Sequence, residues 1–198
     1  MHNEEKVAAD ILQALIESDY DGVEIIAIND RSTDGTAAII DAFAALHSNI
    51  KALHRSTGNG GKPGALEFAT RHARGEIILL FDADYIPGRA LLKRLVAPFC
   101  DPEVGAVMGR VVPHNVGDSI LAGLLSLERA AGYQVGQEAK QRLGLVPQFG
   151  GTVGGVRASA LQAVGGWKYR VAYRRYRSHL PASASGLESR LRESRRVL

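Results

Sequence analysis

Apolar residues are arranged in two ways along the chain up to about residue 167. Short segments rich in apolar residues, which predict strands, occur at residues 23–28, 50–54, 77–81 and 104–111, and the one at 77–81 is apolar throughout. Elsewhere apolar residues recur every three or four positions, as they do on one face of a helix. Helices are therefore predicted from the first residues to about Leu15, around Ile40, and at residues 65–74, 89–99, 119–140 and 158–164.

Polar residues mark the expected starts of the first two helices. Asn3 is the predicted N-cap of the first, because Glu4 and Glu5 suit the positive end of a helix. Residues 29–35 are predicted to form a loop in which Asp34 caps the helix around Ile40. A Gly-rich loop is predicted at residues 56–64.

The alternation of strands and helices predicts an α/β fold with a doubly wound, mostly parallel sheet. In such a sheet the carboxyl ends of the strands share one edge, where ligands bind. Polar clusters follow three of the predicted strands and contain Asp30, Lys62, and the pair Asp82 and Asp84. We therefore expect these residues to meet at one edge of the sheet.

The pair Asp82 and Asp84 is the most informative feature of the chain. Alternate residues of an extended segment point the same way, so both carboxylates can converge at the end of the strand at 77–81. A metal-bound diphosphate would fit there. The alternative is a pair of strand-end carboxylates that only face water.

The loop around Lys62 does not match the known phosphate-binding loops. The pattern GxxxxGK[ST] would require Gly at Ser56 and Ser or Thr at Pro63. The loop still presents Lys62 beside a helix start, where backbone N–H groups favour anions. A simple surface turn is the alternative.

Length and charge set the organisation of the chain. With 198 residues, 45% of them hydrophobic, it is long enough for one α/β domain with a sizeable core. Residues 168–198 carry nine Lys or Arg and two Glu within a total net charge of +3, so the remainder is acidic. We predict a domain at 1–167, a poorly ordered basic Arg/Ser-rich tail at 168–198, and no specific nucleic-acid partner. The longest strongly apolar stretch, 120–127, is far below the roughly 20 residues that span a bilayer, so no transmembrane segment is predicted.

The order and spacing of several motifs resemble family 2 glycosyltransferases of the GT-A fold. The similarity covers roughly residues 2–167 and is greatest to synthases of the cellulose, hyaluronan and poly-N-acetylglucosamine type. The motifs that carry it are His2-Asn3-Glu4-Glu5, Asn29-Asp30-Arg31-Ser32 to Thr36, Gly61-Lys62-Pro63-Gly64, Asp82-Ala83-Asp84, Gly150-Gly151-Thr152 and Gly165-Gly166-Trp167.

The resemblance implies transfer of a sugar, with inversion, from a nucleotide-sugar donor, usually a UDP-sugar, to a glycan or other hydroxyl acceptor. It implies that Asp30 contacts the base, that Lys62 lies near the nucleotide, that Asp82 faces the ribose and diphosphate, and that Asp84 binds Mg²⁺ or Mn²⁺. Asp82 is a candidate second metal ligand. The acceptor side would be bordered by Phe149, Gly150, Gly151 and Thr152.

The chain departs from the family pattern at both ends. Relatives have an apolar strand before the Asn-Glu segment, in the middle of the sheet, so the expected fold is a truncated GT-A domain that lacks its first strand. After Gly165-Gly166-Trp167 the segment with the family's general-base Asp is missing, and the residues of the base are therefore unknown. The tail beyond it is either a divergent sequence or the product of a shifted reading frame.

These departures make catalysis by this chain an open question. The alternative function is a non-catalytic module that binds a nucleotide sugar or a partner. A phosphatase of the haloacid dehalogenase type, with Asp82 as nucleophile, is less favoured because Ile86 stands where that pattern places Thr or Val. The expected location is the cytoplasm or the cytoplasmic face of the cell membrane.

Overall fold

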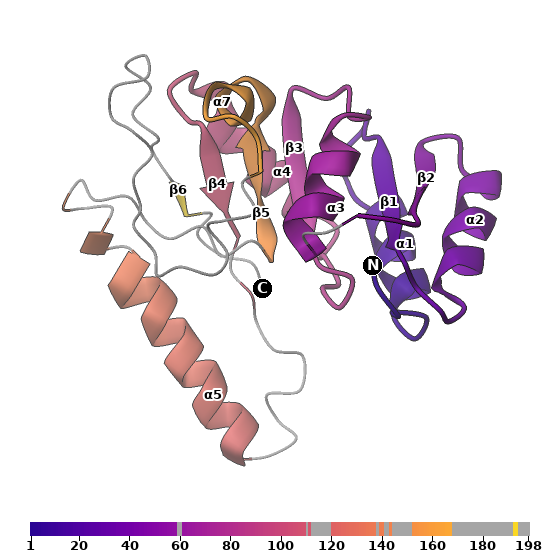
Figure 1. Cartoon of the computed structure of the whole chain (residues 1–198). Coiled ribbons are helices and arrows are strands. Elements are labelled where there is room, and N and C mark those ends of the chain that lie inside the picture. The colour runs from indigo at the N-terminus through magenta and orange to yellow at the C-terminus, as the bar shows by residue number, and fades with distance from the viewer. Residues whose placement is uncertain are drawn as a thin grey trace.

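The computed structural model describes residues 1–58, 61–109, 111, 120–137, 139–140, 143, 152–167 and 192–193 (Figure 1). The strands are β1 (Ile25–Asp30), β2 (Ile50–Arg55), β3 (Ile77–Phe81), β4 (Ala106–Met108), β5 (Val153–Arg157) and β6 (Arg192–Glu193). The helices are α1 (Ala8–Ile16), α2 (Thr36–Leu46), α3 (Gly61–Thr70), α4 (Leu91–Val96), α5 (Ile120–Ala131) and α7 (Ala158–Ala163), with a 3-10 segment η1 (Ala97–Cys100) and a π-helical segment η2 (Gly132–Gln137).

Strands β1 and β2 form a parallel pair in register from Ile25 opposite Ile50 to Asp30 opposite Arg55. Helices α1 and α2 pack on this pair. The core between them consists of Leu12, Ile25, Ala27, Ile40 and Ile50. Burial of these apolar side chains is the main force that holds the helices on the strands.

A second sheet has the strand order β3, β5, β4, β6. Strand β5 is antiparallel to both β3 and β4, so the sheet is mixed where we predicted a mostly parallel one. Its core consists of Leu91, Leu95, Phe99, Val104, Val107 and Val153. The predicted α/β class is confirmed, and the antiparallel strand comes from the segment that follows residue 151.

Strands β1 and β3 are not joined by hydrogen bonds among the described residues, and they belong to separate sheets. Helix α3 lies over the gap between them (Figure 1). Asp19 follows α1 and Arg89 precedes α4, and the Asp19 N–H donates to the Arg89 carbonyl at 2.9 Å. The segments that follow α1 and precede α4 therefore meet.

The first two helices begin later than predicted, because polar residues before them bind each other. Asn3 has a positive φ of 57° and accepts from the Thr33 N–H at 2.8 Å, so it caps no helix. The Glu4 N–H donates to Thr36 Oγ1 at 2.8 Å. Asp34 accepts from the Thr36 N–H at 3.1 Å, although Gly35 occupies the N-cap position. The residues before α1 are thus fixed to the loop before α2.

Other boundaries shift by a few residues. Helix α3 begins four residues before the predicted start, so the Gly-rich segment is partly helical. Helix α4 ends at Val96 and continues as a 3-10 turn, because Pro98 lacks an N–H for the helical ladder. The predicted strand at 104–111 shortens to β4, and the predicted helix at 119–140 divides into α5 and η2. Strand β3 matches its predicted range of 77–81.

The predicted basic tail at 168–198 lies almost entirely outside the described residues; within it only Arg192 and Glu193 are described, as β6 beside β4. Helix α5 extends away from the two sheets and exposes several leucines (Figure 1). Within the described ranges, no helix is both long and apolar enough to cross a membrane.

Candidate functional site

Asp30 lies at the carboxyl end of β1 and is held by two arginines. Its carboxylate accepts from Arg55 Nε at 2.8 Å and Arg55 Nη2 at 2.7 Å, a two-pronged pairing of two planar groups. Arg31 Nε donates to the same carboxylate at 3.0 Å. Asp30 and Arg55 are only 6% and 8% exposed. Arg55 was not predicted as a site residue, although an Arg directly after the predicted strand at 50–54 was an available signal.

Burial opposes ionisation of Asp30, but hydrogen bonds and charges from Arg55 and Arg31 outweigh it. The net effect lowers the pKa of the Asp30 carboxyl below its usual value. Asp30 is therefore a fixed anion at neutral pH. The base-binding role that the resemblance implies would require its remaining acceptor capacity to face the ligand.

Lys62, in the first turn of α3, forms an ion pair with Asp82, the residue directly after β3. This contact brings two of the predicted site residues together and joins α3 to the end of β3. The Asp82 N–H also donates to the Thr152 carbonyl at 3.0 Å. Asp82 is thus fixed from both sides, by α3 and by the residue that precedes β5.

Asp84 is exposed two residues beyond Asp82 and makes no hydrogen bond or ion pair with any other residue that the structure describes. Its carboxylate is therefore available for an external ligand. Among the described residues no group of three or more His, Cys, Asp or Glu side chains could hold a metal ion. A Mg²⁺ or Mn²⁺ ion fits this donor set because such ions are often held by one or two carboxylates, with phosphate and water completing the shell.

A cavity of about 1070 Å³ connects these residues: Asp30, Lys62, Asp82 and Asp84 all line it. The Met1 α-amino group also lines it and donates to the Ile28 carbonyl at 2.7 Å. Burial lowers the pKa of this amino group, and the nearby Asp30 and Asp82 carboxylates partly offset the effect. The structure thus brings the three predicted polar clusters to one cavity, although β1 and β3 belong to separate sheets and not to the single sheet that was predicted.

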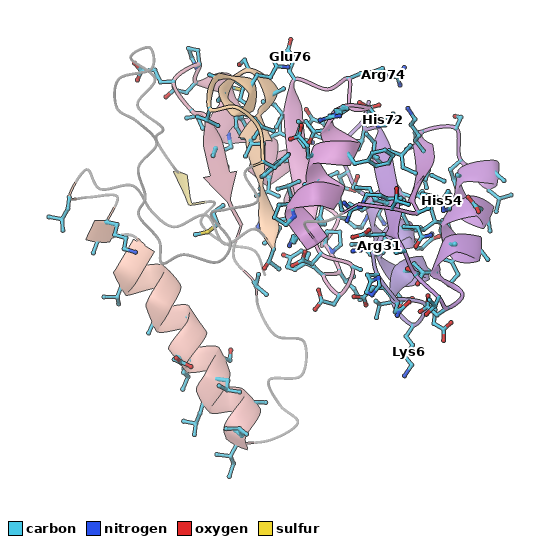
Figure 2. The ribbon with its side chains drawn as sticks, in the orientation of Figure 1. Lys6, Arg31, His54, His72, Arg74 and Glu76 are labelled. Atoms are coloured by element: carbon cyan, nitrogen blue, oxygen red, sulfur yellow. The ribbon has the colours of Figure 1, made fainter. Side chains whose placement is uncertain are left out.

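Figure 2 labels residues that lie at the two opposite ends of strands β1 and β3. Arg31 lies at the carboxyl end of β1, and Arg74 and Glu76 lie at the opposite end, before β3 (Figure 2). The candidate site is at the end that Arg31 marks. Of the predicted acceptor-side residues, Phe149, Gly150 and Gly151 lie outside the described residues, and Thr152 lies beside Asp82 through its carbonyl.

The motif Gly165-Gly166-Trp167 packs on α3. Gly165 and Gly166 have φ values of 82° and 76°, a left-handed conformation that favours glycine. The following Trp167 donates from its ring N–H to Thr70 Oγ1 at 2.9 Å and from its backbone to Glu67 at 3.2 Å. These contacts fix the helix whose first turn carries Lys62.

Comparison with known proteins identifies the family. Residues 1–164 match the family described as Glycosyl transferase family 2. This chain belongs to that family. It is 34% identical over 173 residues to a beta-monoglucosyldiacylglycerol synthase of Synechocystis sp., covering 83% of this chain and 35% of that protein. It is 30% identical over 167 residues to a poly-beta-1,6-N-acetyl-D-glucosamine synthase of Staphylococcus epidermidis, covering 84% of this chain and 40% of that protein.

The family 2 fold is also found among solved structures. A mannosyltransferase from Pyrobaculum calidifontis, solved in complex with GDP-Man and Mn²⁺, superposes with a TM-score of 0.70 at 29% identity, over 85% of this chain and 46% of that one. A glucosyl-3-phosphoglycerate synthase from Mycobacterium tuberculosis, solved with UDP, has a TM-score of 0.60 at 17% identity, over 98% of this chain and 66% of that one, and supports the fold alone. The chain has a GT-A fold and spans about two fifths of the length of these two curated relatives.

Family membership also bears on the alternatives left open by the sequence. Family 2 relatives use nucleotide-sugar donors, and the P. calidifontis structure contains a divalent ion together with its donor. The alternative of a haloacid dehalogenase-type phosphatase is set aside on this basis.

Proposed function

We propose that this chain binds the nucleoside diphosphate part of a sugar donor, a UDP-sugar, together with Mg²⁺ or Mn²⁺. The supporting observation is that Asp30, Lys62, Asp82 and Asp84 line one cavity at the carboxyl edge, in a chain that belongs to family 2. The cavity edge combines a buried anion, an exposed cation and two carboxylates. That combination suits a ligand with hydrogen-bonding, anionic and metal-bound parts.

Each residue has a proposed part in binding. Asp30, held as an anion by Arg55, accepts a hydrogen bond from the base. Lys62 leaves Asp82 and pairs with the diphosphate, because two negative charges are a stronger partner than one carboxylate. Asp84 binds the divalent ion, with Asp82 as a second ligand, and the ion supplies neutralisation of charge on the departing diphosphate.

The acceptor is proposed to enter beside residues 149–152, whose last member, Thr152, is fixed to Asp82. In an inverting transfer the acceptor hydroxyl attacks the anomeric carbon, and the bond from that carbon to the diphosphate oxygen breaks. A general base takes the hydroxyl proton. The proposed acceptor is a glycan or another molecule with a free hydroxyl group. The proposed location is the cytoplasmic face of the membrane. Both follow from likeness to synthases of the family.

The proposal is tested by isothermal titration of the chain with UDP in the presence of Mn²⁺. Asp84→Asn removes the metal ligand's charge and should weaken UDP binding at least about tenfold, since a charged hydrogen-bonding contact is worth roughly 1.5–3 kcal/mol. Asp21→Asn is the matched control, because Asp21 is an exposed carboxylate before the amino end of β1. Equal affinity with Mn²⁺ and with EDTA would contradict the proposal.

The choice of base is tested in the same titration. UDP should bind more tightly than GDP if the proposed donor is correct. The P. calidifontis relative was solved with GDP-Man, so the reverse order is a real possible outcome. Tighter binding of GDP would still support a nucleotide site at these residues, but the proposed donor would change from a UDP-sugar to a GDP-sugar.

The second candidate function is a non-catalytic binding module. It is favoured by one observation: the sequence contains no Asp after Asp118, whereas the resemblance places the general-base Asp beyond Gly165-Gly166-Trp167. We expect donor binding with sugar transfer at least about 10²-fold below that of a complete relative, the low end of what a general base contributes. The measurement is release of UDP from UDP-sugars with and without acceptor glycans. Transfer at the rate of a complete relative would show that another residue supplies the base.

A further inference from the structure

Two arginines hold the Asp30 carboxylate, and they differ in burial. The side chains of Asp30 and Arg55 are each 8% exposed, whereas the side chain of Arg31 is 41% exposed. Arg55 therefore contacts the carboxylate from inside the protein, and Arg31 contacts it from the solvent side. A ligand that approaches Asp30 from solvent meets Arg31 first.

The two arginines together use the acceptor capacity of the Asp30 carboxylate. An ionised carboxylate offers about four lone-pair positions. Arg55 donates from Nε to Oδ1 at 2.8 Å and from Nη2 to Oδ2 at 2.7 Å. Arg31 donates from Nε to Oδ1 at 3.0 Å and from Nη2 to Oδ2 at 3.5 Å. A further N–H group can therefore donate to Asp30 only if one of these arginines withdraws.

The strengths of the two ion pairs decide which arginine withdraws. The pair of Asp30 with Arg55 is buried, and breaking it would leave an uncompensated charge in the protein interior. The pair with Arg31 is half-exposed and is screened by water, so little free energy is lost when it opens. The hydrogen bonds from Arg31 are also the longer ones. Arg31 is thus the group that an incoming donor can replace.

The backbone of Arg31 explains how its side chain reaches Asp30. Adjacent side chains of an extended strand point to opposite faces, so a residue directly after Asp30 would normally point away from it. Arg31 instead has a φ of 58°, a left-handed conformation that is uncommon for residues other than glycine. This turn allows the guanidinium group to fold back onto the neighbouring carboxylate. Glycine would suit the backbone better, so the contribution of Arg31 lies in its side chain.

The Arg31 side chain can withdraw while its backbone stays in place. The Arg31 N–H donates to the Arg55 carbonyl at 3.1 Å, beyond the last paired residues of β1 and β2. The next N–H, that of Ser32, donates to Asn29 Oδ1 at 3.1 Å. The main chain is therefore fixed on both sides of the Arg31 side chain.

Withdrawal of Arg31 would release one contact of the Gly-rich segment and leave another intact. Arg31 Nη1 donates to the Gly58 carbonyl at 3.2 Å, and this bond would open with the pair to Asp30. Arg55 Nη2 donates to the Gly61 carbonyl at 3.3 Å, and this bond would remain. Gly61 directly precedes Lys62, so the first turn of α3 stays fixed to Asp30 through Arg55.

We propose that Arg31 is an internal competitor of the nucleobase: it occupies the acceptor positions of Asp30 in the free protein and gives them up to a base that carries a ring N–H, such as N3–H of uracil. A ligand without that donor leaves Arg31 in place. This inference rests on the proposed nucleotide binding and adds the residue that the base must displace.

The test is isothermal titration of wild type and Arg31→Gly with UDP in the presence of Mn²⁺. Glycine suits the φ of 58°, so the variant is expected to fold. UDP should bind about two- to tenfold more tightly to Arg31→Gly, the range that corresponds to one net hydrogen bond. Charge alone predicts the opposite, because the loss of a cation weakens the attraction for an anionic ligand.

Two controls separate competition from other effects. Arg89→Gly removes an arginine that is 71% exposed and pairs with Asp19, so it should not tighten UDP binding. UDP methylated at N3 of uracil keeps the ribose and both phosphates but lacks the donor. Its affinity should not increase in Arg31→Gly.

The side-chain Nε–H signals in NMR spectra give a second measurement. On addition of UDP and Mn²⁺ to wild type, the signal of Arg31 should shift because its partner changes from a carboxylate to water. The signal of Arg55 should keep its slow exchange with water, because its pair with Asp30 stays buried. Exchange that becomes faster at Arg55 and not at Arg31 would overturn the proposal.

The outcomes also separate this inference from the proposed function. UDP that binds wild type as tightly as Arg31→Gly, or more tightly, would overturn the competition and leave nucleotide binding intact. An equal gain in affinity for UDP and for its N3-methylated form would overturn it in the same way. If neither protein bound UDP in a Mn²⁺-dependent manner, the proposed function would be contradicted and this inference with it.

Discussion

Arg55→Met tests the buried ion pair that fixes Asp30. Asp30 and Arg55 are both more than nine-tenths buried and joined by two hydrogen bonds of 2.8 and 2.7 Å. Methionine keeps an unbranched apolar chain in place of the arginine stem and removes the guanidinium group with its charge and donors. The variant leaves a buried carboxylate whose described partner is the half-exposed Arg31.

The magnitude follows from the burial. Removing one partner of a buried ion pair typically costs about 3–5 kcal/mol, because the other charge stays uncompensated. Arg31 remains bonded to Asp30, so we expect a loss of unfolding free energy near 3 kcal/mol. For a domain of this size that corresponds to a fall in Tm of about 6–12 °C.

The pH dependence has a definite sign. The pKa of Asp30 is lower in the folded protein than its usual value, mainly because Arg55 and Arg31 offset the cost of burial. Its stabilising effect is therefore complete above the unfolded pKa of about 3.9 and is lost as the pH falls through the folded pKa. The difference in unfolding free energy between wild type and Arg55→Met should narrow below about pH 4.

The assay is urea unfolding at several pH values, with Arg74→Met as the control. Arg74 is 86% exposed and pairs with Glu24 at 3.2 Å, so its loss should cost less than about 1 kcal/mol. The double variant Asp30→Asn with Arg55→Met also removes the uncompensated charge of the buried Asp30 carboxylate. Its unfolding free energy should therefore be higher than that of Arg55→Met alone. Equal losses for Arg55→Met and Arg74→Met, or additive losses in the double variant, would refute the reasoning.

Two further predictions concern packing and charge. Gly155→Ala should lower stability by about 1–3 kcal/mol in urea unfolding, since its Cβ would meet Leu79 at 2.7 Å, whereas Gly88→Ala meets nothing within 4 Å and should change stability by less than about 0.5 kcal/mol. Lys62→Met should tighten Mn²⁺ binding in the absence of nucleotide by up to about fivefold in a titration, because Asp82 loses its cation, and should weaken UDP binding. Unchanged Mn²⁺ affinity would contradict the role of the ion pair.

Sequence patterns predicted strands better than helix ends. Strand β3 was predicted at its observed bounds because its apolar run ends abruptly at Asp82. The first helix was predicted too early, because Asn3 and Glu4 suit a cap but bind Thr33 and Thr36 in a loop distant along the chain. Tertiary hydrogen bonds of this kind leave no local pattern. The antiparallel direction of β5 also depends on pairing that the sequence alone does not specify.

Some features of the candidate site could be predicted from the sequence and others could not. The meeting of Asp30, Lys62 and Asp82 follows from their positions after predicted strands, and the structure brings them to one cavity. The buried partner Arg55 was not predicted, because its role depends on the register that places it opposite Asp30. Phe149 to Gly151 lie outside the described residues, so their acceptor-side role stays a prediction.

The contact of Trp167 with α3 gives the protein an internal optical probe. Trp167 is the single tryptophan of the chain, and its ring N–H bonds to Thr70 at the end of the helix whose first turn contains Lys62. Excitation at tryptophan wavelengths therefore reports on one place, the contact between the segment that ends at Trp167 and helix α3. If Lys62 moves from Asp82 to a diphosphate and α3 shifts with it, the fluorescence of this indole will change without any added label.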